Sequence, residues 1–192
     1  TTLKNSAPKI VALVLVLTYL LLMRAFRSLL LPLKAIVMDL LSIASAFGAL
    51  VLIFRSGIGT TLFGTYHLPQ IEVWVLIFLF ALLFGLSMDY EVFIVSRIRE
   101  AKDRGTSNAE AIVEGMAHTG GVVSGAAIIL IAASSGLIFG HIAGLQEVGI
   151  GLAFGILIDA TIIRGMLLPA TMVLLGRWNW WLPAYLTIVK PK

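Results

Sequence analysis

The chain has 192 residues, of which 59% are hydrophobic and 12% are charged, and its mean hydropathy is +1.02. A soluble domain carries about 45–50% apolar and about 25% charged residues, so this composition excludes a water-soluble globule and a disordered chain. The formal net charge is only +4, and the absence of cysteine excludes a disulfide scaffold and a zinc–thiolate site.

Apolar runs long enough to cross a bilayer recur along the chain. A helix of roughly 20 apolar residues spans a bilayer core about 30 Å thick. Five such runs are bounded by charged residues: Pro8–Arg24, Lys34–Phe54, Glu72–Ser96, Val122–Gly140 and Glu147–Leu175. We therefore predict an all-α fold, a polytopic membrane bundle of five transmembrane helices that forms one domain over residues 1–192.

Two of the connections between these spans carry local signals. The segment Gly57–Pro69 is rich in Gly and Thr, includes Tyr66 and His67, and is predicted to be a connection on the outer face. Ser107 followed by Glu110 has the pattern of a capping box. This pattern predicts a cytoplasmic helix over about 107–120 that leads into the fourth span.

The end of the fifth span has its own signals. Pro169 is expected to kink or break the helix, because proline lacks the backbone N–H and its ring clashes with the preceding turn. The tail 176–192 is predicted to lie at the cytoplasmic interface. Its Trp178, Trp180 and Trp181 are typical of an aromatic belt that anchors the chain there.

The positions of Lys and Arg predict the orientation of the chain. Ten of the fourteen Lys and Arg residues lie in the segments 24–34, 97–104 and 177–192, which are predicted to lie on one side of the membrane. The segments on the other side hold only Lys4, Lys9 and Arg55. Short loops rich in Lys and Arg stay in the cytoplasm, so the N-terminus is predicted outside and the C-terminus inside. A chain that starts outside at Thr1, with no signal-peptide pattern, is expected to be a piece of a longer polypeptide.

Ionisable side chains at membrane depth cost roughly 2.5–3.5 kcal/mol each on insertion scales and therefore need a partner, a wet cavity or a function. The sequence places four inside the spans: Asp39, Asp89, Asp159 and Arg164. Asp39 follows Lys34 by five residues, so we expect it to reach the interface or pair locally. Asp89 lies about 12 Å of helix from Arg97. Burial would favour its neutral form, so it is a candidate proton carrier or the donor of a structural hydrogen bond.

Asp159 and Arg164 are five residues apart, which places them about 140° apart around an α-helix. They are therefore predicted to engage different neighbours, either in a buried charge network or in direct proton handling. Asp89 ends a strip of small residues formed by Ala81 and Gly85, and Asp159 ends a second strip formed by Gly151 and Gly155. Because small residues let helices approach closely, we expect both acids to face packed protein.

Tyr90 points about 100° away from Asp89 around the helix, so the pair is expected to reach polar groups on a second helix. The candidates within this chain are Ser124 and Ser134 of the fourth span. Each of these hydroxyls can instead bond back to its own helix.

Four stretches carry a resemblance to one family. GLSMDYEVFIVSRIREA (85–101) resembles the Asp-Tyr helix of the MMPL family, which belongs to the RND superfamily of proton-driven exporters. FRSLLLPLKAIVMDLLSI (26–43), GIGLAFGILIDATIIRGMLLPATM (149–172) and GRWNWWLP (176–183) are similar to its other signatures, in the same order.

This resemblance implies that the chain is the last five helices of a twelve-helix RND-type permease in the bacterial inner membrane. It implies that Asp89 and Tyr90 form a proton relay, with a matching Asp-Tyr pair in a missing N-terminal half or an equivalent chain. Asp159 and Arg164 match a charged pair of the family, and Glu91, Arg97 and Ser124 are expected to support the relay. The expected partners are the lipid bilayer and a lipid or other hydrophobic cargo, with no cofactor, no metal and no nucleic acid.

Two other functions remain open at this point. A transport-incompetent remnant or an accessory membrane subunit would also lack the second half of a relay. An intramembrane aspartyl protease would use Asp89 and Asp159 as a dyad that shares one proton. The HExxH, GxSxG and P-loop patterns are absent from the sequence, so zinc hydrolysis, serine catalysis and direct ATP use have no support.

Overall fold

The computed structural model describes residues 2–56, 64 and 70–181, and this part of the chain contains helices and no strand. The elements are α1 (Thr2–Phe26), α2 (Leu30–Leu50), η1 (Val51–Arg55), α4 (Val73–Asp103), α5 (Asn108–Ile138), α6 (Ala143–Ile158), η2 (Asp159–Leu167), α7 (Leu168–Leu175) and η3 (Gly176–Trp180). Of these, η1 and η2 are π-helical and η3 is a 3₁₀-helix.

Five helical segments are long and apolar enough to cross a membrane, as the sequence predicts. They are Pro8–Phe26, Leu30–Arg55, Val73–Asp103, Asn108–Ile138 and Ala143–Trp180. The fifth consists of α6, η2, α7 and η3 in succession. The all-α fold and the multi-pass membrane bundle are therefore confirmed.

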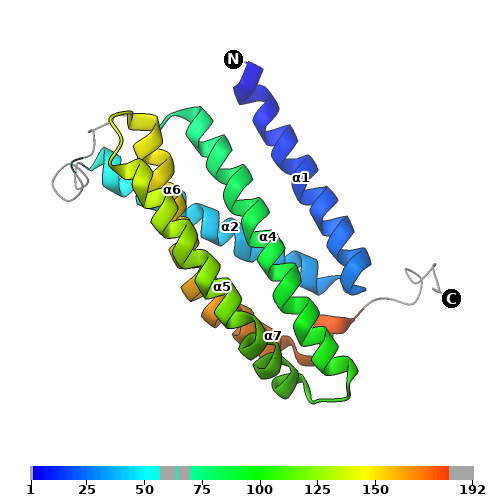
Figure 1. The fold of residues 1–192 in the computed structure, drawn as a ribbon. Coiled ribbons are helices and arrows are strands. Elements are labelled where there is room, and N and C mark those ends of the chain that lie inside the picture. The colour runs from blue at the N-terminus through cyan, green and yellow to red at the C-terminus, as the bar shows by residue number, and fades with distance from the viewer. Residues whose placement is uncertain (1, 57–63, 65–69, 182–192) are drawn as a thin grey trace.

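The helices α2, α4, α5 and α6 pack together, and α1 lies at the edge of this group (Figure 1). α6 packs against α2, α4 and α5, and α4 also packs along α5. α1 packs mainly against α2. Only 11% of the apolar stretch of α1 is buried inside the bundle, compared with 39% for each of the apolar stretches that contain α2 and α6. Most of the apolar surface of α1 is therefore left for lipid or for another protein segment.

The apolar core has two clusters that meet at Met88 of α4, which packs against both. One cluster contains Met38, Ile94 and Ile163, and the other contains Ile43, Leu83 and Ile156. On α2, α4 and the fifth span alike, a short polar stretch lies between the residues of the two clusters. The fold therefore holds a polar layer between two apolar layers.

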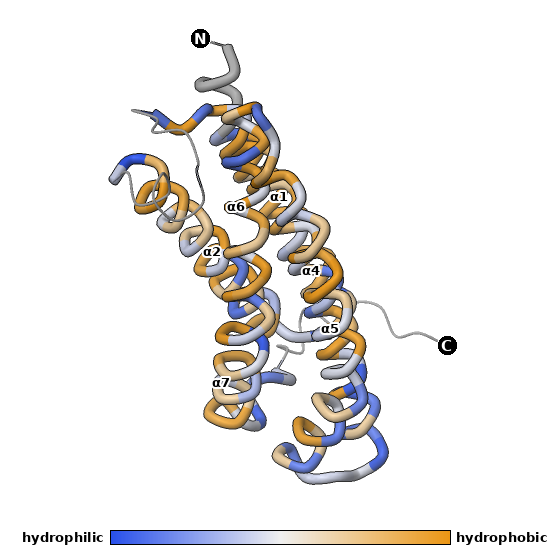
Figure 2. Tube along the Cα trace, turned by 60° about the vertical axis from the view of Figure 1, so that its left-hand side comes forward, coloured by the Kyte–Doolittle hydropathy of each residue, from blue (hydrophilic) through white to orange (hydrophobic). Residues whose placement is uncertain are grey.

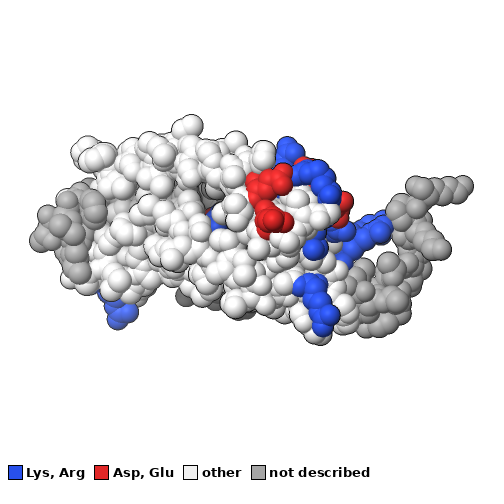
Figure 3. Space-filling view, turned by 90° about the horizontal axis from the view of Figure 1, so that it is seen from below, with Lys and Arg blue, Asp and Glu red and all other residues white. Residues whose placement is uncertain are grey.

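Hydrophilic residues otherwise lie mainly toward the ends of the helices, including the connection between α4 and α5 (Figure 2). Figure 3 shows Lys, Arg, Asp and Glu gathered at the end of the molecule that carries this connection. Arg104 and Glu114 form an ion pair there, as do Arg97 and Glu100 at 2.8 Å. This charged end is the one that the distribution of basic residues predicts to be cytoplasmic.

The predicted capping box is present at the start of α5. Ser107 Oγ accepts from the Glu110 backbone N–H at 3.3 Å, and Glu110 Oε2 accepts from the Ser107 N–H at 3.0 Å. The helix then runs without interruption from Asn108 to Ile138, so no break separates a cytoplasmic helix from the fourth span. The predicted outer connection Gly57–Pro69, apart from Gly64, lies outside the described residues.

The predicted break at Pro169 is not found, because the chain stays helical through the proline, and the helix type changes directly before it. Pro169 is in the first turn of α7, and the nine-residue π-helix η2 comes directly before it. The tryptophans beyond α7 divide into two kinds. Trp178 and Trp181 are 52% and 48% exposed, whereas the ring of Trp180 lies 5.5 Å from the guanidinium carbon of Arg99.

The contact between α4 and α5 depends on Gly115. A Cβ atom at this position would lie 2.8 Å from the Ile98 backbone nitrogen and 2.9 Å from its Cα, so the two helices would have to separate. We expect Gly115→Ala to lower the free energy of unfolding by about 1–3 kcal/mol, the usual cost of overpacking. Thermal unfolding of the purified protein in detergent measures the change.

Gly125 on the same helix is the matched control, because no atom lies within 4 Å of a Cβ built there. Alanine is favoured over glycine inside a helix by about 1 kcal/mol, so Gly125→Ala should be neutral or stabilising. Equal stability of the two variants would contradict the packing described for Gly115.

Candidate functional site: an intramembrane charge cluster

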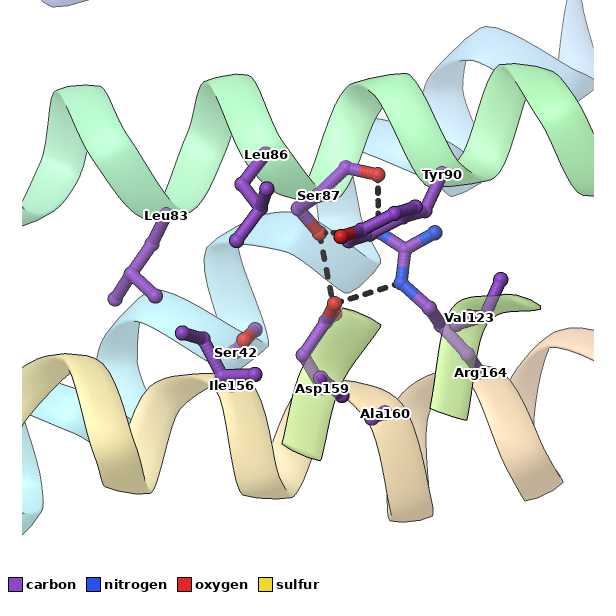
Figure 4. Close-up of a pocket in the computed structure, with 11 residues that line it drawn as sticks. Ser42, Leu83, Leu86, Ser87, Tyr90, Val123, Ile156, Asp159, Ala160 and Arg164 are labelled. Carbon is purple, nitrogen blue, oxygen red and sulfur yellow. Dashed lines mark hydrogen bonds and ion pairs between the residues drawn. The ribbon is translucent and has the colours of Figure 1, made fainter. Parts of the chain in front are cut away.

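Five polar side chains from three elements are buried together within the bundle, and Figure 4 shows three of them, Ser87, Asp159 and Arg164. We call them the inner cluster: Asp39 of α2, Ser87 and Glu91 of α4, and Asp159 and Arg164 of η2. Their exposed fractions lie between 1% and 7%. Charged groups with so little exposure are stable only when other charges and hydrogen bonds compensate them.

Asp159 and Arg164 pair directly, which corrects the prediction that they engage different neighbours. Arg164 Nε donates to Asp159 Oδ2 at 2.6 Å. The prediction assumed α-helical geometry, but residues 159–167 are π-helical. In a π-helix, hydrogen bonds join residues i and i+5, so side chains five positions apart lie on the same face.

Ser87 connects the charged groups of the other elements. Its hydroxyl lies within hydrogen-bonding distance of Asp39 Oδ1 and 3.1 Å from Asp159 Oδ1. Arg164 Nη2 donates to the hydroxyl at 2.6 Å and also to the Ser87 carbonyl oxygen. The resulting network links α2, α4 and η2 at one level of the bundle.

Asp39 is part of this network, and the prediction that it reaches the interface or pairs locally with Lys34 is wrong. It is 1% exposed, and its Oδ1 lies 3.9 Å from Arg164 Nη2. That prediction rested on the short separation of Asp39 and Lys34 along the chain. A better signal was Ser42, one helical turn further on, which shares its face of α2 and is also buried.

Tyr90 faces the same network from α4. Its ring centroid lies 5.5 Å from the Arg164 guanidinium carbon, a cation–π distance. Tyr90, Ser87, Asp159 and Arg164 line a small cavity of about 10 Å³, which is close to the space needed by one water molecule (Figure 4).

Asp89 points elsewhere, and the prediction that it faces packed protein does not hold for this chain. It is exposed and lines an open groove of about 1100 Å³ between α1, α2 and α4. Ala81 and Gly85 line the same groove, and no atom lies within 4 Å of a Cβ built on Gly85. Their strip of small residues therefore borders the groove and does not touch a neighbouring helix.

The second strip behaves as predicted. A Cβ at Gly151 would lie 2.5 Å from Leu79 Cδ1, and one at Gly155 would lie 2.7 Å from Leu83 Cδ1. These glycines bring α6 close to α4 and bury Asp159, which directly follows α6. The sequence pattern was the same in both strips, and only the packing of the helices distinguishes them.

The three residues expected to support the relay are separated in the structure. Glu91 is buried and interacts electrostatically with Lys34 and Arg164. Arg97 is exposed at the charged end, where it pairs with Glu100. Ser124 is exposed on α5 and does not line the cavity, whereas Ser134 bonds back to its own helix at Leu130 O, 2.8 Å away.

These features define an integral membrane helical bundle that holds a charge network inside its apolar layer. In the residues that the structure describes, no group of three or more His, Asp or Glu side chains is arranged to bind a metal. The chain belongs to the MMPL family, whose family model matches residues 2–191. The resemblance found in the sequence is thereby confirmed.

Several named relatives are similar over almost the whole chain. The trehalose monomycolate exporter MmpL3 of Mycolicibacterium smegmatis is 40% identical over 188 residues, which cover 98% of this chain and 18% of the relative. The heme uptake protein MmpL11 of Mycobacterium tuberculosis H37Rv is 38% identical over 96% of this chain and 19% of its own length. The mycolic acid-containing lipids exporter MmpL11 of M. smegmatis is 34% identical, with the same two coverages. This chain thus spans about a fifth of the length of these relatives.

Proposed function

We propose that this chain is part of a transporter that uses the proton-motive force to export lipids or other hydrophobic molecules across the cell membrane. The observation that carries the proposal is a carboxyl group, Asp89, on the wall of an apolar groove within a membrane-spanning helix. One relative is named an exporter of mycolic acid-containing lipids and another an exporter of trehalose monomycolate, which supports a lipid cargo.

In this proposal Asp89 and Tyr90 bind the transported proton, and the groove faces a second half of the permease that supplies another Asp-Tyr pair. An acid exposed toward a neighbouring helical half can gain and lose a proton while remaining out of bulk water. Tyr90 extends from the same turn toward Arg164, so it links the proton-binding acid to the inner cluster. Protonation of Asp89 would thereby shift the electrostatic balance of the helices around Arg164.

The proposed orientation places the charged end of the bundle in the cytoplasm. Protons then enter from the outer side, and each one contributes about 2.3 kcal/mol per 100 mV of membrane potential. Several protons per cycle would supply enough free energy to move a lipid out of the membrane.

The geometry gives no support to the protease alternative. Asp89 lines the open groove, whereas Asp159 lines the closed cavity and pairs with Arg164. A catalytic dyad needs two carboxyl groups close enough to share a proton, whereas Asp89 opens to the groove and Asp159 is buried in the inner cluster.

The test uses the full-length protein in proteoliposomes made from a radiolabelled lipid extract of the producing organism. An imposed pH gradient, acidic on the outer side, should accelerate the delivery of labelled lipid to an acceptor outside, and a protonophore should remove the acceleration. Delivery that is indifferent to the gradient would exclude proton-driven export. Activity that appears only with a co-purified chain carrying a second Asp-Tyr pair would identify this protein as one subunit of a split transporter.

A further inference from the structure

The Ser87 hydroxyl lies within hydrogen-bonding distance of three groups of the inner cluster: Asp39 Oδ1, Asp159 Oδ1 and Arg164 Nη2. A hydroxyl has one proton to donate and two lone pairs that accept. The guanidinium of Arg164 can only donate, so it occupies one lone pair. Ser87 can donate to one carboxylate, and the other carboxyl group can bond to Ser87 only by donating. The three contacts together therefore require one carboxyl group to be protonated.

A count of the charged groups near Ser87 also indicates one bound proton. Three acids, Asp39, Glu91 and Asp159, face two cations, Arg164 and Lys34. Tyr90 adds a neutral ring, and the walls contributed by α5 and α6 are apolar, with Val123, Ala127 and Ile156. Five ionised groups would leave one negative charge without compensation in a low-dielectric layer, which is costly. One bound proton makes the total charge of these five groups, Lys34 included, zero.

The hydrogen bonds distinguish the two acids beside Ser87. Asp159 receives a charge-assisted bond from Arg164 Nε at 2.6 Å, which stabilises its ionised form. Asp39 is 3.9 Å from Arg164, and its Oδ2 is buried without a hydrogen-bond partner among the described residues. An ionised carboxylate with an unsatisfied buried oxygen is the more costly of the two. We propose that Asp39 is a proton-binding residue that shares one proton with Asp159 through the Ser87 hydroxyl.

This proton-binding site is separate from the one assigned to Asp89. Its existence does not depend on the proposed function, and only its role in transport rests on that function. Loss of the shared proton would leave Arg164 between two carboxylates instead of one, and these carboxylates belong to different helices, α2 and η2. The cavity beside Ser87 and Arg164, about 10 Å³ in volume, offers space for one water molecule through which the proton could leave. Protonation at Asp39 would thus control how tightly the fifth span is held against α2.

Infrared difference spectroscopy tests the inference without any transport assay. The full-length protein in lipid nanodiscs carries Asp89→Asn, so that the acid of the groove does not contribute. Between neutral and strongly alkaline pH, this protein should lose a protonated-carboxyl C=O band that shifts in D₂O, and addition of Asp39→Asn should remove the band. A band of undiminished amplitude in the double variant would overturn the proposal.

A second variant leaves Asp39 in place, so the test does not depend on whether Asp39→Asn folds. In Ser87→Ala the carboxyl group loses its hydrogen-bond partner, so the band should move to higher frequency while Asp39 is retained. An unmoved band would contradict a proton shared through Ser87. Failure of the proposed function would appear instead as lipid delivery that is indifferent to the pH gradient, with the infrared result unchanged.

Discussion

Replacement of Asp89 by Asn is expected to abolish transport in the full-length protein and to leave its fold intact. Asparagine has nearly the shape of aspartate but cannot release and rebind a proton at this position. The side chain is exposed on the groove and contributes nothing to the two apolar clusters of the core. Its loss therefore removes the proposed proton carrier without opening a cavity or leaving a buried charge unpaired.

Lipid delivery in proteoliposomes under an imposed pH gradient measures the effect, and we expect it to fall to the level of protein-free vesicles. Asp103→Asn is the matched control, because Asp103 ends the same helix, is 72% exposed and forms only a long ion pair with Arg99 at 3.9 Å. The control should transport normally. Gradient-dependent delivery by Asp89→Asn at the wild-type rate would remove Asp89 from the mechanism.

Removal of the positive charge at Arg164 should produce the largest loss of stability. Arg164→Met retains a long side chain but leaves Asp39, Asp159 and Glu91 with a single cation, Lys34, in the apolar layer. Removing one partner of a buried ion pair typically costs about 3–5 kcal/mol, because the other charge remains uncompensated. Equilibrium unfolding of the purified protein in mixed micelles measures this difference.

The loss should shrink at acidic pH, because protonation of the acids that are ionised at neutral pH removes the charges that Arg164 compensates. Arg97→Met is the control on α4, since Arg97 is 49% exposed and its contacts are an ion pair with Glu100 and a cation–π contact with Phe93. A surface ion pair contributes about 0.2–1 kcal/mol. If Arg164→Met were no more destabilising than this control at neutral pH, the inner cluster would not be held together by Arg164.

Several features of this protein follow from the sequence alone. The length and hydropathy of the five spans depend on the thickness of the bilayer, which acts on each helix separately. The capping box at Ser107 depends on neighbours within a few residues. The strip that ends at Asp159 was also predicted correctly, because glycines spaced by four residues allow close helix contact wherever a partner exists.

Only the tertiary structure shows which residues come together in the site. Asp39 joins Asp159 only because α2 and α6 pack side by side, and no local pattern specifies which helices become neighbours. The pairing of Asp159 with Arg164 depends on π-helical geometry, which changes the angle between residues five apart. Asp89 and Asp159 follow the same small-residue pattern, yet one faces an open groove and the other a closed cavity. Local sequence thus determined the helices and their apolar spans, whereas the packing of the helices decided which charges meet.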